Sequence, residues 1–410
     1  MSDVARTVEA VWRIESARVV AALARMTGDL GLAEDLAQEA VVDALAQWPE
    51  SGVPRNPDAW LTAVAKRKAV DVWRRRERLD DRYRLLAHEL ESSVQGAEAA
   101  EPIDDDVLRL VFTACHPVLA REAQVALTLR IVGGLSTEQI ARLFLIPVAT
   151  VQQRIVRAKK TLAAAKVPFE APDRGEWPER LGSVLGVVYL VFTEGYAATS
   201  GAQWMRTELA DEALRLGRMI AGLLPREPEA HALVALMELQ ASRFGARVGP
   251  DGAPVLLADQ DRARWDRTQI ARGRAALARA DRLGRGRGHY ALQAAIAEVH
   301  AVAPDVDATD WGHIVLLYEA LGRIAPNPVV ELNRAVAVSM ATGPASALLI
   351  VDRLADDGAL RGSYLLPSVR GELLARLGRT EEARSELTTA AGLAANERTR
   401  DVLIAKAAAL

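Results

Sequence analysis

Apolar residues recur every three or four positions through most of this chain, a spacing that gathers them on one face of a helix. No long run alternates apolar with polar residues as a half-buried strand would. The pattern predicts a first helix broken at Gly28, a second from Leu32 to Trp48, and a third that opens at Asn56-Pro57. Further helices are expected at about 106–115, 121–132, 137–145 and 149–165. The predicted fold class is all-α.

The same spacing continues through the second half, where Gly, Pro or Asp separates most of the expected helices. They lie at about 178–195, 206–224, 227–244, 257–283, 288–302, 310–322, 328–341, 345–355, 364–377, 380–394 and 397–409. The stretch from Gly371 to Ala383 is close to a tetratricopeptide repeat, in which small residues let two antiparallel helices approach closely. Stacked pairs of this kind form a solenoid whose concave side suits a peptide or protein surface. The run from Phe192 to Tyr196 is interpreted as a helix terminus in preference to a ligand site.

The stretch from Gly133 to Leu162 predicts two short helices joined by a tight turn. Ser136 can cap the first helix together with Gln139, and Pro147 ends it because the residue before a proline is pushed out of the α region. The second helix has an inner apolar stripe of Val151, Ile155, Ala158 and Leu162. Its outer faces carry Gln152, Gln153, Arg154, Arg157 and Lys160.

Amides and guanidinium groups on such a helix can read base edges in a major groove, while Lys and Arg hold phosphates. The stretch is therefore interpreted as a helix-turn-helix reader of DNA. A helical hairpin with a solvated charged face is the alternative.

Charge changes sign along the first third of the chain. Between Arg25 and Arg55 every charged residue is acidic: Asp29, Glu34, Asp35, Glu39, Asp43 and Glu50. This acidic helix is either a solvated face or a docking surface for a basic partner. The next helix is basic, with Lys66, Arg67, Lys68, Arg74, Arg75 and Arg76 interleaved with Trp60 and Trp73. Cations follow phosphates and rings stack on bases, so this helix is a candidate single-strand binder unless both tryptophans belong to the core.

Composition narrows the class of protein. Of 410 residues, 50% are hydrophobic and 26% charged, as in a soluble globular protein. The single cysteine, Cys115, excludes an intramolecular disulfide, and the pair Cys115-His116 lacks the further ligands of a metal site. The other candidate histidines, His231, His289, His300 and His313, fall at no catalytic or metal-binding spacing, so neither an enzyme activity nor a cofactor is expected.

Hydropathy points to the compartment. No apolar signal core opens the chain, and no stretch reaches the roughly 18 apolar residues of a membrane span. A cytoplasmic location without membrane contact is therefore expected.

The ordered motifs of the first 166 residues resemble the extracytoplasmic-function sigma factors of bacterial RNA polymerase. Gly28-Asp29 followed by Ala33-Glu34-Asp35-Leu36-x-Gln38-Glu39 is similar to region 2.2, the helix that docks on the polymerase β′ clamp helices. Asn56-Pro57-x-x-Trp60-Leu61, Asp71 and Trp73-Arg74-Arg75-Arg76 resemble regions 2.3 and 2.4, which melt and read the −10 element. The helix-turn-helix resembles region 4.2, the −35 reader, with Thr150-Val151 and Arg157-Ala158-Lys159 at the usual places.

Other motifs resemble a subgroup of long sigma factors with a helical C-terminal extension, the ECF42 group. They are Phe112 to Pro117, Glu122 to Arg130, Phe144 to Pro147, Phe192 to Tyr196 and Glu331 to Ala337. Two positions depart from the family. Lys66-Arg67-Lys68 stands where many members carry Asn, so the fine −10 preference does not carry over. The turn has Leu145-Ile146-Pro147 in place of the common Gly, which predicts a different turn shape.

The resemblance implies specific site residues. For polymerase binding they are Glu34, Asp35, Leu36, Gln38 and Glu39. For the −10 element they are Trp60, Lys66, Arg67, Asp71, Trp73, Arg74, Arg75 and Arg76, and for the −35 element Thr150, Gln152, Gln153, Arg154, Arg157 and Lys160. The implied partners are promoter DNA and core RNA polymerase, through its β′ clamp helices and β flap.

The expected domains are sigma region 2 at residues 1–84, an acidic linker at 85–105, sigma region 4 at 106–168 and a tetratricopeptide-like helical domain at 178–410. The function implied is promoter-specific transcription initiation. The C-terminal domain is expected to pack on the sigma domains or bind a protein or peptide, and so regulate or scaffold initiation. The alternative function is a DNA-binding regulator that acts without polymerase and senses a ligand or peptide through its helical repeats.

Overall fold

Helices form nearly all of the regular structure, as the hydrophobic spacing predicts. The computed structural model describes residues 3–77, 103–197, 204–249, 254–284 and 286–410. Within these residues the only pairing of the β type is an isolated antiparallel bridge between Val248 and Pro254. The chain divides into two compact units, Met1–Val188 and Tyr189–Leu410, here called the N-terminal and C-terminal units. The all-α prediction is confirmed.

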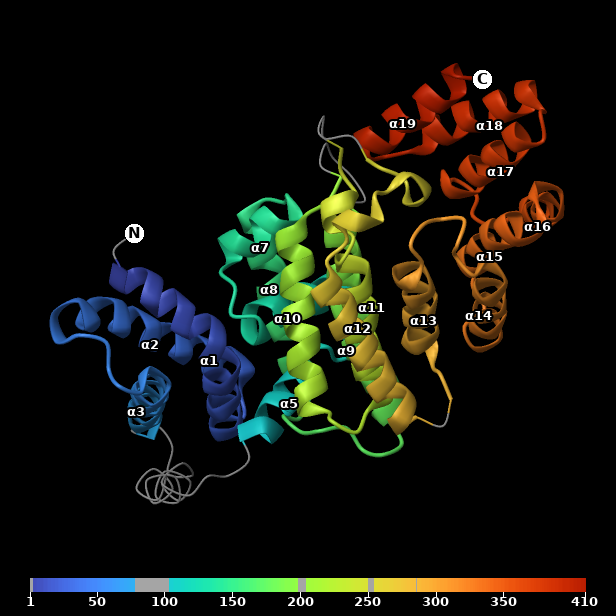
Figure 1. Cartoon of the computed structure of the whole chain (residues 1–410). Helices are drawn as coiled ribbons and strands as arrows, with labels where there is room; N and C mark the ends of the chain where they lie inside the picture. The colour runs from blue at the N-terminus through green and yellow to red at the C-terminus, as the bar shows by residue number, and fades with distance from the viewer. Residues whose placement is uncertain (1–2, 78–102, 198–203, 250–253, 285) are drawn as a thin grey trace. The chain divides into compact units, whose positions relative to one another are not determined.

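The N-terminal unit contains two groups of helices (Figure 1). The first group is α1 (Asp3–Thr27), α2 (Leu30–Ser51) and α3 (Pro57–Glu77). The second is α5 (Ile103–Ala114), α6 (Arg121–Leu127), the π-helical turn η2 (Thr128–Val132), α7 (Thr137–Phe144) and α8 (Val148–Ala164). Helix α1 packs against α2 and α3 and also against α5 and η2, so it belongs to the contact between the groups. Most of the expected acidic linker lies outside the described residues, and residues 103–105 already belong to α5.

The break between α1 and α2 follows from the residues that the sequence places there. Gly28 has a left-handed backbone, with φ at 65°, which ends α1 at little steric cost. The Asp29 carboxylate then accepts hydrogen bonds from the backbone N–H of Gly31 at 2.8 Å and of Leu32 at 3.1 Å. This N-cap starts α2 at Leu30, two residues before the predicted start.

The first turns of α9 (Trp177–Tyr196) belong to the N-terminal unit. The Trp177 ring lies 5.1 Å from the Phe112 ring of α5, and the Arg180 guanidinium donates to the Phe112 carbonyl at 3.1 Å. The Ser183 hydroxyl donates to the Cys115 carbonyl at 2.9 Å. These contacts explain why the compact unit extends to Val188, beyond the position where the sequence predicts the C-terminal domain to begin.

The C-terminal unit is a succession of helices, each packed against the next (Figure 1). After the end of α9 they are α10 (Thr207–Leu223), α11 (Pro228–Ala241), α12 (Arg267–Leu283), α13 (His289–Val302), α14 (Trp311–Ile324), α15 (Pro328–Thr342), α16 (Pro344–Asp356), α17 (Leu365–Arg376), α18 (Thr380–Leu393) and α19 (Glu397–Ala408). Their bounds lie within a few residues of the predicted ones, with one exception.

The exception is the helix predicted at 257–283, which begins only at Arg267. The Asp266 carboxylate accepts from the backbone N–H of Thr268 at 2.8 Å and of Gln269 at 3.0 Å, and so caps the helix there. Residues 257–259 and 262–264 form two short 3-10 turns instead. The predicted helix start was wrong because apolar spacing alone does not reveal which carboxylate caps a helix.

Two helix pairs of the C-terminal unit depend on glycine for their close approach. A Cβ added to Gly371 of α17 would lie 2.8 Å from Leu387 Cγ of α18 and 3.2 Å from the Ala383 carbonyl oxygen. Gly273 of α12 meets Leu239 of α11 in the same way, at 2.7 Å. The prediction that small residues allow close helix pairing near Gly371 is confirmed.

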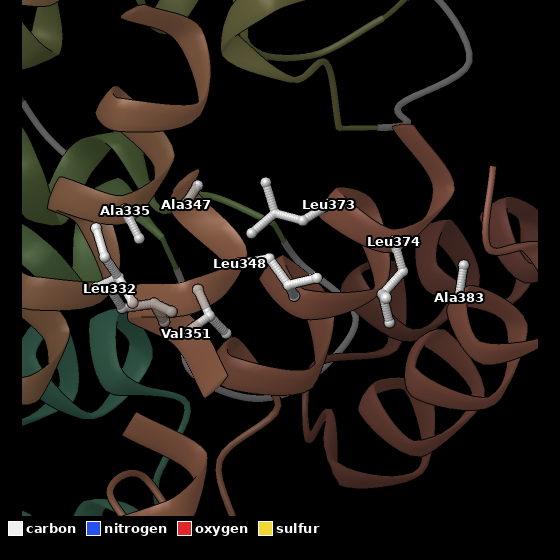
Figure 2. Packing of buried hydrophobic residues seen from close by; sticks show 9 residues of the cluster. Leu332, Ala335, Ala347, Leu348, Val351, Leu373, Leu374 and Ala383 are labelled. Atoms are coloured by element: carbon white, nitrogen blue, oxygen red, sulfur yellow. The ribbon is translucent and has the colours of Figure 1, made fainter. Parts of the chain in front are cut away.

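An apolar cluster continues from one helix pair to the next. Figure 2 shows it across α15 to α18: Leu332, Ala335, Ala347, Leu348, Val351, Leu373, Leu374 and Ala383. Because the cluster draws on four successive helices, each pair buries part of its apolar surface against its neighbour, as stacked helical pairs do.

The run from Phe192 to Tyr196 ends α9, as the sequence predicts. Glu194 forms an ion pair with Arg206 at 2.8 Å, and a Cβ on Gly195 would lie 2.4 Å from the backbone nitrogen of Ala210. The Arg247 guanidinium lies over the Tyr196 ring, 3.4 Å from its centroid. These contacts fix the end of α9 against α10, which is a structural role.

Candidate nucleic-acid interface

Capping bonds fix the first helix of the helix-turn-helix. The backbone N–H of Gln139 donates to the Ser136 hydroxyl at 3.1 Å, and that of Ser136 donates to the Gln139 side-chain oxygen at 2.8 Å. The predicted capping box is confirmed. Helix α7 ends at Phe144, and Leu145 takes the left-handed conformation that Gly usually supplies, with φ at 55°. The turn therefore stores roughly 1–2 kcal/mol of backbone strain.

Helix α8 separates into a buried and an exposed face. The predicted inner stripe is buried: Val151, Ile155, Ala158 and Leu162. Gln152, Gln153, Arg157 and Lys160 are exposed, whereas Thr150 and Arg154 are partly buried. Four of the six expected −35 residues thus form one solvent-facing surface, here called the reader face. Its amides and cations are open to solvent and can approach a major groove.

One further exposed side chain lies among the residues of the reader face and was not predicted from the sequence. Val156 is 49% exposed and follows Gln152 by one helical turn. An apolar side chain at this place can contact the methyl group of thymine. The sequence does contain a pattern that predicts this exposure, because Val156 is a β-branched residue among the polar residues of the outer face.

A groove of about 300 Å³ lies beside the reader face. Arg154 and Arg157 of α8 line one side, and Val118 and Leu119, just before α6, line the other. Glu122 of α6 also lines the groove, so the two guanidinium groups face one carboxylate as well as apolar side chains, and Arg157 reaches DNA from the exposed face.

Helix α3 carries the expected −10 residues, and the structure describes the surroundings of one of its two tryptophans. The Trp60 ring meets the buried Trp48 ring edge-on at 5.4 Å, so Trp60 belongs partly to the core. Trp73, Arg75 and Arg76 lie on α3, but their side chains are outside the described part of the structure. The other expected residues are at least partly exposed along the helix: Lys66, Arg67, Asp71 and Arg74.

Lys68 connects α3 to the acidic helix. Its ammonium lies 3.0 Å from the Asp43 carboxylate and 3.3 Å from that of Glu39, and the hydrogen bond to Asp43 raises the pKa of Lys68. The acidic helix is therefore partly neutralised within its own group of helices. This pairing restricts Lys68 to a structural contact in the described conformation.

The five expected polymerase-binding residues of α2 divide into two sets. Asp35 and Glu39 are exposed and Gln38 is partly exposed, so these side chains can meet a partner. Leu36 is buried in the helical core, and Glu34 is only 5% exposed.

Glu34 lies between the two groups of helices. The Arg130 Nε of η2 donates to Glu34 Oε1 at 2.7 Å, and the Lys159 ammonium of α8 donates to Glu34 Oε2. Burial alone would raise the pKa of the Glu34 carboxyl, but the charges and hydrogen bonds of Arg130 and Lys159 lower it below its ordinary value. Lys159 thus faces α2, and the reader face lies elsewhere on α8.

The Cys115-His116 pair has structural surroundings. Cys115 is buried, and burial raises the pKa of its thiol to about 11 although Thr128 lies within hydrogen-bond distance at 3.3 Å. The His116 ring accepts a hydrogen bond from the Val118 backbone N–H at 3.1 Å. Nowhere in the described ranges do three His, Cys, Asp or Glu side chains come together in a group that could hold a metal ion.

Comparison with known families decides how these two groups of helices are to be understood. Sigma-70 region 2 matches residues 13–79, and sigma-70 region 4 matches residues 109–162. SigI of Mycobacterium tuberculosis, a probable ECF RNA polymerase sigma factor, is 30% identical over 39% of this chain and 56% of its own length. The chain belongs to the extracytoplasmic-function sigma-70 family. This sigma factor is therefore a DNA-binding protein of transcription initiation, and its two matched regions contain the expected polymerase-binding and DNA-binding residues.

Two further comparisons extend beyond the sigma regions. Residues 180–281 of this sigma factor match a family of unknown function, DUF6596. An uncharacterised protein of Rhizobium meliloti is 46% identical over 92% of the chain and 90% of its own length, so the C-terminal unit is shared as well. No solved structure matches the chain. None of the described helices combines the length and hydrophobicity needed to cross a bilayer.

Proposed function

We propose that this sigma factor directs promoter-specific initiation through three surfaces. The exposed acids of α2 dock on the β′ clamp helices of core RNA polymerase, α3 melts and reads the −10 element, and the reader face of α8 reads the −35 element. The observation that carries the proposal is the reader face, because its exposed Gln152, Gln153 and Arg157 have the side chains that recognise base edges.

The charge of the reader face fits a factor that works with polymerase. Affinity for DNA of any sequence grows with the number of phosphates that a protein neutralises. The outer surface of α8 offers few cations, and Lys159 is engaged with Glu34. Such a helix supports selective contacts but only modest affinity of its own, so core polymerase, with its β flap near region 4, is expected to supply the rest.

Reconstituted transcription tests the proposal. Purified full-length protein added to core polymerase should start transcription at a specific promoter, and it should co-purify with the core enzyme. Failure to associate with core polymerase would contradict the proposal. A footprint on DNA by the protein alone, without polymerase, would instead support a polymerase-independent regulator.

Base reading by α8 can be separated from phosphate contact. We expect Gln153→Ala to cost about 1–3 kcal/mol of promoter binding and to relax specificity at one −35 position. Arg142→Ala, an exposed cation on α7, is the matched control and should weaken binding equally for all sequences. An equal loss for all sequences with Gln153→Ala would show that this residue does not read a base.

We further propose that the C-terminal unit regulates or scaffolds initiation, with no enzymatic step. Its tightly paired helices around Gly273 and Gly371 support a tetratricopeptide-like platform for a protein or peptide, or for the sigma regions themselves. A chain ending at Val188 keeps the contacts of α9 with α5 and tests this role better than a cut before Trp177. Promoter activity and regulation identical to the full chain would contradict the proposal.

A further inference from the structure

A buried carboxylate joins the two halves of the N-terminal unit. Glu34 of region 2 receives hydrogen bonds from Arg130 and Lys159 of region 4, and the side chains of these two cations are only 16% and 18% exposed. Lys159 also lies 3.4 Å from Asp35, an exposed acid of the proposed polymerase-binding surface. One region 4 lysine therefore contacts both Glu34 and the edge of the surface with which region 2 would meet polymerase, although the Asp35 side chain stays 72% exposed.

Contacts away from Glu34 continue the same interface. The Gln139 amide of α7 donates to the Glu9 carboxylate of α1 at 2.7 Å. A Cβ on Gly134 would lie 2.5 Å from the Ser16 hydroxyl, so the region 4 backbone passes directly over α1. Arg25 of α1 lies 3.2 Å from the Asp106 carboxylate of α5. The two regions thus form one closely packed body.

This packing is incompatible with simultaneous reading of both promoter elements. The −35 and −10 elements are about 25 base pairs apart, which is roughly 85 Å at about 3.4 Å per base pair. In the described conformation α8 touches α2 through Lys159, and α2 packs against α3. The two reading helices therefore cannot reach both elements. Residues 78–102, which join the regions, would span about 80–90 Å if fully extended, so chain length permits a separation.

The chemistry of the contact allows it to open. A buried ion pair gains little net free energy, because desolvation of the charges offsets most of their attraction. Promoter phosphates can replace Glu34 as the partner of Lys159, and a basic polymerase surface can replace Lys159 as the partner of Asp35.

We propose that the Glu34–Arg130–Lys159 contact holds this sigma factor in a closed, autoinhibited conformation, in which region 4 buries Glu34 and binds it beside the exposed docking acids of region 2. When the protein opens, contacts with polymerase and DNA replace the contacts between the two sigma regions. This inference rests on the proposed function. Arg130 is the informative position, because it belongs to neither the expected DNA-binding nor the expected polymerase-binding residues.

Distance measurement on the full-length protein tests the closed conformation without polymerase. Spin labels are attached at Val53→Cys and Val118→Cys, two exposed positions on regions 2 and 4 outside the expected binding residues. The buried Cys115, whose thiol pKa is raised to about 11, should stay unlabelled. The free protein should show one narrow short distance, and Arg130→Gln should add a broad longer population. A long, broad distance in the unsubstituted protein would overturn the proposal.

Affinity for core polymerase is the second measurement that tests the proposal. If the closed form dominates the free protein, Arg130→Gln should tighten binding several-fold, up to about tenfold for a 90% closed population. Lys166→Gln, at an exposed cation just after α8, is the control and should change neither distance nor affinity. Since Arg130 also donates to the Leu135 carbonyl, Lys159→Gln serves as a second opening variant, and thermal unfolding checks the fold of both.

Together, the label distance and the affinity for core polymerase distinguish failure of this proposal from failure of the proposed function. Polymerase binding that Arg130→Gln and Lys159→Gln leave unchanged would refute autoinhibition and keep the sigma function. A distance shift in a protein that never binds core polymerase would refute the sigma function while showing that the contact does close the two regions.

Discussion

Each unit of this sigma factor contains a buried glutamate held by two cations, and the two arrangements differ in what they join. Glu34 is held by Arg130 and Lys159, from a different sigma region. Glu238 of α11, only 1% exposed, is held by Arg218 of α10 at 3.0 Å and Arg272 of α12 at 3.1 Å.

The difference lies in sequence separation and in the exposure of the cations. The helices around Glu238 follow one another in the chain, so they stay adjacent even if an ion pair breaks, and the side chains of Arg218 and Arg272 are nearly half exposed. Arg130 and Lys159 are largely buried and come from a region that the chain could carry away from Glu34. The same chemistry thus stabilises a permanent fold in one unit and a reversible contact in the other.

Neutralising Glu238 should mainly destabilise its unit, whereas neutralising Glu34 should mainly open the contact between the sigma regions, and this is the largest expected difference. Glu238→Gln should lower the free energy of unfolding of the C-terminal unit by about 2 kcal/mol, below the roughly 3–5 kcal/mol of a fully buried pair because its arginines reach water. Glu34→Gln should lower unfolding stability by less than about 1 kcal/mol and lengthen the Val53–Val118 label distance, since opening returns both cations to water. Denaturant unfolding followed by circular dichroism measures the first effect. Equal destabilisation by both variants would remove the distinction.

Acid should affect the C-terminal unit first. Burial, with the charges of Arg243 and Arg262, lowers the pKa of His300 to about 3. Between this value and the ordinary histidine pKa, His300 is protonated in the unfolded chain and neutral in the folded chain. Stability is then full above the ordinary histidine pKa and falls as pH drops below it, by about 2 kcal/mol at pH 5. Unfolding measured from pH 7.5 to 5 should show this slope. It should become clearly shallower in His300→Asn, leaving the contributions of His231 and His289, whose pKa values burial also lowers, and it should be unchanged in the exposed control His313→Asn.

The Glu34 contact should respond only at lower pH. Because its folded pKa is lowered, the contribution of Glu34 is complete above the ordinary glutamate pKa and is lost as pH falls through the folded value. The label distance should therefore stay short at pH 5, where the C-terminal unit has already lost stability. A distance that lengthens between pH 7.5 and 5 would contradict the assignment of Glu34 as the group that closes the contact.

The close helix pairs of the C-terminal unit give a smaller test. Gly371→Ala would press a Cβ against Leu387 and should cost about 1–3 kcal/mol of unfolding free energy. Gly322→Ala, at a helical glycine with open space around it, is the matched control and should be neutral or stabilising by up to about 1 kcal/mol. Thermal unfolding of both variants decides whether the close approach at Gly371 is required.

The smallest expected effect concerns the edge of the interface between the sigma regions. Glu9→Ala removes the bond from Gln139 and leaves the capping box of α7 intact, because Gln139 caps through its oxygen and binds Glu9 through its nitrogen. We expect about 0.5 kcal/mol or less in favour of opening, visible as a small broadening of the label distance.

Local patterns in the sequence sufficed for most helices and for the two faces of α8. The capping box at Ser136 and the inner stripe from Val151 to Leu162 depend only on residues a few positions apart, so both were predictable. The start of α12 was missed because Asp266, and no break in apolar spacing, determines it.

Long-range partners were beyond the reach of these patterns. Nothing near Glu34 in the sequence indicates that it is buried against cations 96 and 125 positions away. For the same reason, Lys159 could be assigned to the −35 motif by resemblance while its contact with region 2 stayed hidden.

One distance tests most directly whether this sigma factor is closed when free and opens to read a two-part promoter. The labels at Val53 and Val118 are measured in the full-length protein before and after core polymerase and promoter DNA are added, with transcript formation checked in the same sample. We expect a short distance in the free protein that lengthens by tens of ångströms in the transcribing complex. A short distance retained in a complex that makes transcript would contradict it.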